Sequence, residues 1–447
     1  MAEPAINKKD EINKVVDEGI DKGIARLTPE KIKQVINKVL ASETGARLKA
    51  YVETCVHCGL CSEACHYYLS HDNDPKYSPA GKVKQTIWEI LKKKGNVDPE
   101  FIRNASRIAY TECNLCRRCA MYCPFGIDIA YLMSIVRRLC HMLGVTPLYI
   151  QDTAHSHSAC LNQMWVKEDE WIDSLFWQEE EAQDEISSLR IPLEKEGAET
   201  LYSVIAPEPK FRAQLIYQAA VIMNVAGVDF TMPATPGWDN SDLCMFTGDY
   251  EMMGRLKKAH FETAMRLKVK RIVMGECGHA FRSVYDVGNR WLAWKMPPIP
   301  IIHAVELYYE LLKEGKIKIT KKYDKPVTFQ DPCNIVRGKG LHEKARYVVN
   351  AICEEFIEMH PNREHNYCCC AGGGVINTGP QYKMTRIKGN RIKAEQLFAT
   401  KARGAKVIIA PCHNCHGGIE DINHHFGLDM ELHFLGDIIY KVMEKPE

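Results

Sequence analysis

The chain has 447 residues, of which 46% are hydrophobic and 26% charged, so it can bury the cores of two or three domains. Its formal net charge of +1 offers no excess of Lys and Arg for a nucleic-acid duplex, and we exclude that class of partner. The polar N-terminal stretch 1–14 has no secretory signal, and the most apolar stretch, 215–228, is too short to cross a bilayer and predicts a buried helix. We therefore expect a cytoplasmic protein that reaches the cytoplasmic face of a membrane only through a partner subunit.

Nineteen cysteines are the most informative part of the composition. Because thiols stay reduced in the cytosol, these cysteines do not indicate a disulfide framework, and metal ligation explains them better. Thirteen of the nineteen fall into three groups. The remaining six are Cys277 and Cys370 together with four that we expect in the core, Cys140, Cys160, Cys244 and Cys353.

The first predicted element is an N-terminal helical extension over residues 1–45. Thr28 provides an N-cap, Pro29 occupies the first helical position, and apolar residues follow at helical spacing as far as Leu40. Residues 46–150 then contain two groups of four cysteines, with a helix predicted over 87–91 between them. We expect this segment to form one domain around the cysteines.

Each of these two groups has the spacing Cys-x2-Cys-x2-Cys-x3-Cys, and the second is followed by Pro124. Such runs are typical of ferredoxins with two cubane 4Fe-4S clusters, in which three cysteines of one run and the fourth of the other bind each cluster. A pair of zinc sites, the alternative, leaves the third closely spaced cysteine of each run unexplained. His66, where a proline usually follows the fourth cysteine, is expected to loosen the turn without removing a ligand. We predict one cluster on Cys55, Cys58, Cys61 and Cys123, and the other on Cys113, Cys116, Cys119 and Cys65.

Residues 151–200 predict a linker helix followed by an acidic segment. Trp165, Trp171 and Trp177 precede the acidic run at 179–185. These aromatic side chains are expected either to pack on a neighbouring domain or to form a docking surface for another subunit.

From residue 201 onward, short β-branched runs alternate with helical patterns, which is typical of strand–helix units that build a parallel sheet. The stretch RIVMGEC at 271–277 is similar to KVIIAPC at 406–412, which indicates an internal duplication with halves at 201–320 and 321–447. The predicted fold class is mixed α+β and α/β: a helical two-cluster ferredoxin-like domain followed by a duplicated α/β domain. Strands are predicted at 202–205, 271–274, 327–329 and 407–410.

The third cysteine group lies in the second half of the duplication. Two of its members directly follow predicted strands, at the carboxyl ends where open α/β sheets place ligands. The glycines at 372–374 let the backbone approach an inorganic cluster and offer amide donors to sulfur. A zinc site or simply buried cysteines are the alternatives. The group consists of Cys333, Cys368, Cys369, Cys412 and Cys415.

The spacing of this group resembles the CCG domain of the heterodisulfide reductase family, which has a lone cysteine, a Cys-Cys-Gly and a terminal Cys-x-x-Cys. The resemblance implies that the five thiolates hold a non-cubane 4Fe-4S cluster. Cys370 stands where that pattern has glycine, as a tolerated small residue, an extra ligand or a redox thiol. The same alignment places Asp239 and Asn240 of the first half where the paired cysteines would stand, so that half cannot build a full cluster.

Cys277 and His279 are what the first half retains of the terminal Cys-x-x-Cys. If they face the cluster across the interface between the halves, they would serve as supporting groups, a substrate-facing thiol or proton donors, and a structural role is equally open. We include both with the five CCG cysteines in the predicted catalytic site. His424 and His425 are expected in a solvated turn.

Over residues 45–445 the sequence resembles the DsrK, TmcB and HmeD group, relatives of HdrD, the catalytic component of membrane heterodisulfide reductase. The resemblance implies an iron–sulfur subunit of a respiratory complex, with a membrane cytochrome b-like subunit and a small thiol/disulfide protein such as DsrC as partners. On this interpretation two cubanes relay single electrons, and the CCG-bound cluster reduces or oxidises a disulfide or trisulfide. The stretches that carry the resemblance are 237–249, 275–282, 360–374 and 410–418.

Two other functions are compatible with the motifs. The iron–sulfur subunit of a flavin-linked 2-hydroxy acid or glycerol-3-phosphate dehydrogenase also joins ferredoxin runs to CCG repeats, although the first repeat here has lost cysteines. A non-catalytic electron relay, with the third cluster structural, is the other.

Overall fold

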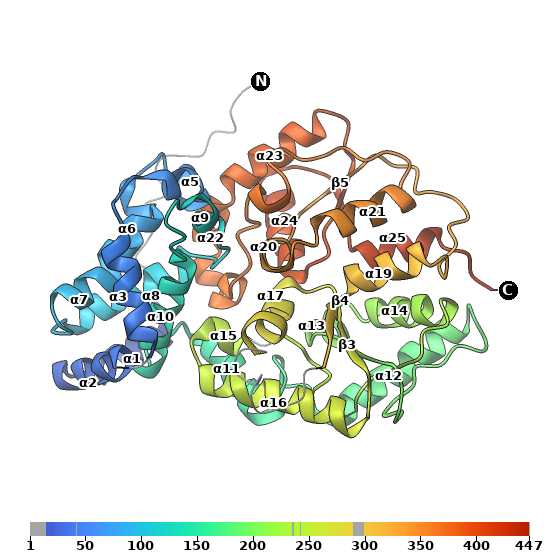
Figure 1. The fold of residues 1–447 in the computed structure, drawn as a ribbon, viewed down its shortest axis with the longest axis horizontal. Helices are drawn as coiled ribbons and strands as arrows, with labels where there is room; N and C mark the ends of the chain where they lie inside the picture. The colour runs from blue at the N-terminus through green and yellow to red at the C-terminus, as the bar shows by residue number, and fades with distance from the viewer. Residues whose placement is uncertain (1–14, 42, 235–236, 242, 289–298, 447) are drawn as a thin grey trace.

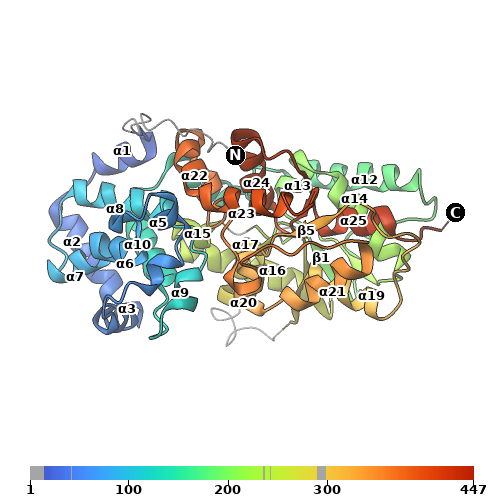
Figure 2. The ribbon, with the colours of Figure 1, turned by 90° about the horizontal axis from the view of Figure 1, so that it is seen from above.

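The computed structural model describes residues 15–446 except 42, 235–236, 242 and 289–298. The polar stretch 1–14 and Asp242 of the stretch 237–249 lie outside the described residues. In Figure 1 the N-terminal helices, in blue, lie at one end of the molecule, and the two α/β halves fill the other end, the first in green and yellow and the second in orange and red. Figure 2, seen from above, shows the same division between the two ends of the molecule.

The N-terminal region begins as predicted. Helix α2 starts at Pro29, and the Thr28 hydroxyl accepts a hydrogen bond from the amide of Lys31, so the predicted cap is confirmed. The helix predicted near 87–91 is a π-helical turn that continues into α7. The helices of this region are α1 (Glu18–Ile24), α2 (Pro29–Leu40), α3 (Glu43–Thr54), α4 (Leu60–Glu63), α5 (His66–Ser70), α6 (Pro79–Val83), the π-helical η2 (Lys84–Trp88), α7 (Glu89–Lys92), α8 (Pro99–Thr111), α9 (Arg118–Tyr122) and α10 (Ile129–Met142).

Two helices, α11 (Leu148–Cys160) and α12 (Glu168–Gln183), cover the predicted linker. Trp171 of α12 is fully buried, stacks on Trp238 with ring centroids 4.4 Å apart, and donates a hydrogen bond to the carbonyl of Pro233. The packing interpretation is therefore right for Trp171. Trp165 and Trp177 are 46% and 72% exposed, and a docking role for them stays a prediction.

The α/β region contains two parallel sheets, as the alternating pattern predicted. The first has the order β2-β1-β3-β4 and the second β5-β6-β7. The predicted strands at 271–274, 327–329 and 407–410 are confirmed, whereas β1 begins two residues before its predicted start. Strands β2, β4 and β7 were not predicted because they have only two or three residues. The strands are β1 (Thr200–Ser203), β2 (Phe230–Thr231), β3 (Arg271–Met274), β4 (Ile301–His303), β5 (Val327–Phe329), β6 (Val407–Ile409) and β7 (Glu431–His433).

Helices cover both sheets, and the predicted buried helix at 215–228 is α14. His424 and His425 are exposed, but they lie in the last turn of α24 rather than in a turn, which corrects that prediction. The helices are α13 (Pro207–Phe211), α14 (Gln214–Val225), α15 (Cys244–Thr247), α16 (Tyr250–Arg266), α17 (Gly278–Phe281), the π-helical η3 (Arg282–Gly288), α19 (Ala304–Lys313), α20 (Cys333–Lys339), α21 (His342–Ile352), α22 (Lys383–Gly389), α23 (Arg391–Lys401), α24 (His413–Phe426) and α25 (Leu435–Val442).

The two halves meet through equivalent segments. Cys277 is the N-cap of α17 after β3, and Cys412 is the N-cap of α24 after β6. The amide of His413 donates a hydrogen bond to the carbonyl of Glu276, 3.2 Å away, which joins these two turns. One hydrophobic core, with members such as Val273 and Ile409, runs through both sheets. The halves therefore form one unit, while the exact domain boundaries stay a prediction.

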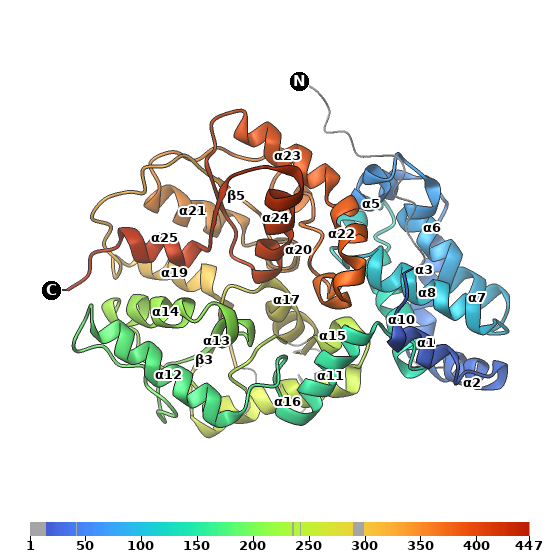
Figure 3. The ribbon, with the colours of Figure 1, turned by 180° about the vertical axis from the view of Figure 1, so that it is seen from behind.

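Helix α22 of the second half contacts α5 of the N-terminal region. Figures 1 and 3 show these two helices side by side at the junction of the regions. The junction is where the cysteine groups meet.

Candidate metal centres

The two four-cysteine loops adopt the same backbone conformation. His57 and Leu115, two residues after the first cysteine of each run, have φ of 57° and 51°. Gly59 and Arg117, one residue after the second cysteine, have φ of 84° and 63°. Left-handed residues at matched positions curl the amide N–H groups inward, which is the arrangement that suits an anionic cluster. The repeat seen in the sequence is therefore a repeat of geometry.

The first centre lies near the surface. Burial raises the pKa of the Cys61 thiol, and nearby Cys55, Cys65 and Cys123 raise it further as thiolates. Cys55, Cys61 and Cys123 of the predicted set are thus neighbours, and Cys58 of the same set is exposed.

The second centre is a pocket at the junction of the two regions. Its lining includes Cys65, Cys113, Cys116 and Cys119, the four residues predicted to share a cluster. Lys82 is 2% exposed and places its Nζ 3.6 Å from the sulfur of Cys65. Burial lowers the pKa of Lys82, but the thiolates raise it more, so the lysine stays charged and offsets their negative charge.

The third group gathers at the carboxyl ends of β5 and β6. The thiol of Cys368 neighbours those of Cys333 and Cys369, that of Cys369 neighbours Cys415, and that of Cys415 neighbours Cys412. The structure therefore brings all five predicted CCG residues together, although they come from segments far apart in the sequence. Their assignment as ligands stays a prediction.

Glycines bring the CCG segment against the second ferredoxin-type loop. Gly373 has φ of 66°, and a Cβ added there would lie 2.3 Å from the carbonyl oxygen of Asn114. Only glycine allows this approach. The side chain of Asn114 also donates to the carbonyl of Gly372, 2.9 Å away.

Cys277 and His279 lie beside the third group, across the interface between the halves. Cys277 lies beside Cys412, and this neighbour lowers the pKa of the Cys412 thiol well below its usual value. The sulfur of Cys277 is 3.3 Å from Nδ1 of His279. Burial raises the pKa of Cys277 and lowers that of His279 to about 4. Near neutral pH this pair is therefore uncharged.

Lys393 is a buried cation that the motifs did not reveal. It is fully buried, and its Nζ donates to Asn366 at 3.1 Å and Gln396 at 2.6 Å. Burial lowers its pKa to about 8, while the thiolates of Cys415 and Cys369 oppose that shift. Lys82 and Lys393 lie in helices without a recognisable spacing, so no sequence signal marked them.

Buried arginines join the second loop to the CCG region. Arg137 is fully buried and donates to the carbonyls of Cys113, Phe246 and Gly373, which belong to three separate segments. Arg282 reaches the carbonyl of Leu115. Two more arginines donate to backbone carbonyls in the same way. Arg337 donates to the carbonyls of Cys116, Glu364 and Asn366, and Arg118 donates to those of Ala64 and His365. The cysteine groups thus lie in one cross-linked interface.

Asp239 and Asn240 of the first half are buried and held by hydrogen bonds. The Asp239 carboxylate accepts from the amides of Gln163, Ala206 and Ser241 at 2.7 to 3.0 Å. The side chain of Asn240 donates to the carbonyl of Ser203. The absence of a full cluster in the first half stays a prediction.

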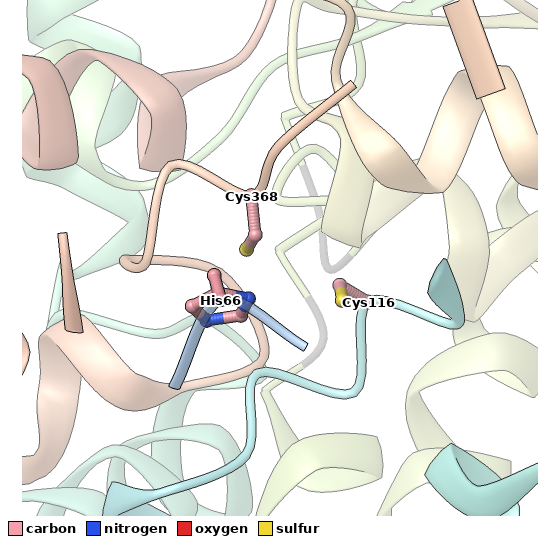
Figure 4. A group of neighbouring side chains, drawn as sticks. All are labelled: His66, Cys116 and Cys368. Carbon is pink, nitrogen blue, oxygen red and sulfur yellow. The ribbon is translucent and has the colours of Figure 1, made fainter. Parts of the chain in front are cut away.

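His66 was interpreted wrongly. It begins helix α5 and is 3% exposed. Cys65 before it has φ of −92° and ψ of 112°, close to the −81° and 115° of Cys123 before Pro124, so His66 does not loosen the turn. One of its ring nitrogens and the sulfurs of Cys116 and Cys368 all lie within 4.8 Å of one another. Figure 4 shows these three side chains gathered between the second loop and the CCG segment.

The other cysteines mostly follow prediction. Cys140, Cys244 and Cys353 are buried core residues, whereas Cys160 is half-buried. Cys370 is fully buried with φ of 63°, and its sulfur is 3.6 Å from Oδ1 of Asn114.

Comparison with known proteins agrees with this geometry. Residues 51–127 match the 4Fe-4S dicluster domain family, and residues 327–420 match the cysteine-rich domain family CCG. The chain is 26% identical to an Hdr-like menaquinol oxidoreductase iron-sulfur subunit of Archaeoglobus profundus, over 86% of this chain and 78% of the relative. It is 24% identical to a subunit of the dihydromethanophenazine:CoB–CoM heterodisulfide reductase of Methanosarcina mazei, over 88% and 93%. It is also 24% identical to EtfAB:quinone oxidoreductase of Syntrophomonas wolfei, over 83% of this chain and 55% of the relative.

The chain is thus an iron–sulfur protein in which a ferredoxin-like 4Fe-4S dicluster domain is followed by a CCG domain. Among such proteins it is related to the HdrD component of heterodisulfide reductase and to the Hdr-like oxidoreductase subunits. Within the described residues, no helix has the length and apolar character needed to span a membrane.

Proposed function

We propose that this chain is the electron-transfer subunit of a heterodisulfide reductase-like respiratory complex. It passes electrons through two ferredoxin-type centres to or from the CCG centre, where a disulfide or trisulfide of a small thiol protein is reduced or oxidised. A membrane cytochrome b-like subunit on the cytoplasmic face exchanges electrons with the first centre. The names of the relatives, which include quinol and heterodisulfide oxidoreductases, support this proposal.

The observation that carries the proposal is the direct approach of the second centre to the CCG group. The sulfurs of Cys116 and Cys368 lie within 4.8 Å of each other. Electrons that reach the second centre therefore have a short path to the CCG thiols. The exposed Cys58 lies in the first centre, where an external partner has access.

The residues fit the groups that the families imply. Four cysteines line the second pocket, five meet at the third, and each site has a buried lysine to offset thiolate charge. When bound, cubane clusters would carry single electrons, and the CCG-bound cluster would contact the substrate sulfur. The protein residues hold the thiolates in place and exclude water, because the thiols of Cys368, Cys369, Cys412 and Cys415 are at most 4% exposed.

Anaerobically purified protein tests the proposal by iron and zinc analysis with electron paramagnetic resonance. Three four-iron clusters correspond to about twelve iron atoms per chain. A colourless protein loaded with zinc would refute it. In a Cys368→Ala/Cys369→Ala variant we expect about eight iron atoms, unchanged cubane signals and no disulfide-linked turnover.

A matched control is Cys353→Ala, which removes a buried thiol of the same half away from the CCG group. It should keep the full iron content and turnover. Full disulfide-linked turnover in the double variant would contradict a catalytic CCG site.

A non-catalytic relay is the second candidate, and the deep burial of four of the five CCG thiols favours it. Only Cys333 is partly exposed. In a relay, a disulfide added to the protein would leave the signal of the third centre unchanged. In the catalytic proposal that signal changes when a disulfide or thiol partner is added.

A further inference from the structure

His66 lies beside two centres, of which its place in the sequence indicates only one. It follows Cys65, the first-run cysteine predicted to bind the second cluster, and its ring lies near both Cys116 of that centre and Cys368 of the CCG group. With 3% exposure, the ring has no contact with bulk water. A residue that only began helix α5 would not need an imidazole at this point.

A small hydrogen-bond network fixes the ring. Asn114 Nδ2 donates to the carbonyl of Gly372, so Asn114 Oδ1 is the acceptor, and Nε2 of His66 lies 2.9 Å from it and donates. The sulfur of Cys370 lies 3.6 Å from the same Oδ1. In this network Asn114 therefore connects His66, which follows Cys65 of the second centre, with Cys370, which follows Cys369 of the CCG group.

The other ring nitrogen is left for the sulfurs. Nδ1 of His66 is buried and has no hydrogen bond to oxygen or nitrogen in the described part of the chain. Because Nε2 bonds to Asn114, only Nδ1 and its edge of the ring are available to interact with the two thiols. Polar groups beside thiolate ligands are a main determinant of the reduction potential of an iron–sulfur centre.

We propose that His66 is a positioning residue that links the second ferredoxin-type centre to the CCG centre. Its ring, anchored by Asn114 and lying beside both Cys116 and Cys368, fixes the surroundings of the two thiolates and adjusts the reduction potentials of both centres together. This inference rests on the proposed function only in requiring that both sites hold clusters.

The test is a redox titration of the full chain, followed by electron paramagnetic resonance, with His66→Phe and His66→Gln. Phenylalanine keeps a ring but removes both nitrogens, while glutamine keeps an amide that can reach Asn114. For His66→Phe we expect the second and third centres to become harder to reduce, with at least a tenfold change in the ratio of oxidised to reduced centre at a fixed potential, or about 59 mV for a one-electron couple. The glutamine variant should show a smaller shift in the same direction.

Two controls separate this role from general damage. The close sulfur contacts of His66 are with Cys116 and Cys368, so the potential of the first centre should change least in either variant. His71→Phe alters a histidine that is also buried but that bonds the carbonyl of Tyr67 and stacks on Tyr77, and it should shift neither centre. Unchanged second and third potentials in both His66 variants, or an equal shift of all three centres, would overturn the inference.

The iron content of the unaltered protein distinguishes the two levels of failure. If about eight iron atoms are found, the third cluster of the proposed function is absent. The shift of the second centre in His66→Phe then still decides whether His66 acts on Cys116.

Discussion

The two halves of the α/β region build the same scaffold and fill it differently. Each has parallel strands, and each places a cysteine at the N-cap of the helix that follows the equivalent strand, Cys277 after β3 and Cys412 after β6. Where the second half has Cys368 and Cys369, the first has Asp239, which accepts three backbone N–H bonds. In the first half, buried backbone groups are thus satisfied by a carboxylate.

Arg137 contacts both halves, so its removal should have the largest effect. Arg137→Met leaves carbonyls of Ala109, Cys113, Phe246 and Gly373 without their donor in a buried interface. At about 1–3 kcal/mol for each unsatisfied group, the loss exceeds about 4 kcal/mol. We expect a lower unfolding temperature and loss of iron from the second and third centres, measured by circular dichroism and iron analysis.

Arg138→Met is the control for this variant. Arg138 is the next residue of α10, is only half-buried, and lies over the ring of Tyr250. Its substitution should change stability by less than about 1 kcal/mol. Equal effects of the two substitutions would show that the contacts of Arg137 with the two halves do not hold the interface.

Restoring the missing thiols to the first half tests whether its pocket can still accept a cluster. Asp239→Cys/Asn240→Cys removes the acceptor of three buried amides, and we expect a loss of about 3 kcal/mol in the free energy of unfolding. Iron content should not rise, because Ala280 occupies the second position of the former Cys-x-x-Cys. Thermal unfolding and iron analysis measure both outcomes.

Asp229→Cys, an exposed position of the same half, is the matched control and should be nearly neutral. A gain of about four iron atoms per chain in the double variant would show that Cys277 and the two new thiols suffice for a cluster.

Glu276 makes the contact between the halves sensitive to pH. Burial raises its pKa to about 8, against the opposing hydrogen bonds from the amides of Gly436 and Leu435. The folded state therefore favours the protonated carboxyl, whose contribution to stability is fully present below the unfolded pKa near 4.5 and is lost as pH rises through 8. Tyr308 donates to the same carboxyl, and Glu208 faces it across a shared cavity.

Glu276→Gln should remove this dependence. Between pH 6 and pH 8 the native protein should lose about 2 to 3 kcal/mol more than the variant, at about 1.4 kcal/mol per pH unit. Unfolding temperatures at several pH values measure the difference. Glu262→Gln, which changes an exposed carboxylate paired with Lys258, should follow the native curve. If Glu276→Gln also follows it, Glu276 is ionised in the fold at neutral pH.

The strongest predictions from sequence concern local spacing. The two cysteine runs, the cap at Thr28 and the long β-branched runs appear in the structure as expected, because each depends on residues close in sequence. The short strands β2 and β4 were not predicted, because two or three residues are too few to show a periodic pattern. Their existence depends on pairing with β1 and β3.

The site shows the same limit. Spacing grouped the thirteen cysteines and placed Cys277 near the CCG group, but it could not reveal that Cys116 and Cys368 are neighbours. That contact depends on how the second loop packs against the CCG segment, a property of the whole fold. His66 was misinterpreted for this reason: its importance comes from what the second run and the CCG segment place around it.

Cys370→Gly is the smallest change and settles the role of the third cysteine in that segment. Cys370 has φ of 63°, a region that costs a non-glycine residue about 1–2 kcal/mol, so glycine relieves strain. It also removes the sulfur that packs beside Gly389 and approaches Asn114, and these losses offset the gain. We expect a net change below about 1 kcal/mol and an unchanged iron content, because the Cys370 sulfur points to Asn114 whereas the five CCG thiols contact one another. Loss of iron or a changed third-centre signal would instead make Cys370 a ligand, in addition to the five predicted CCG thiols.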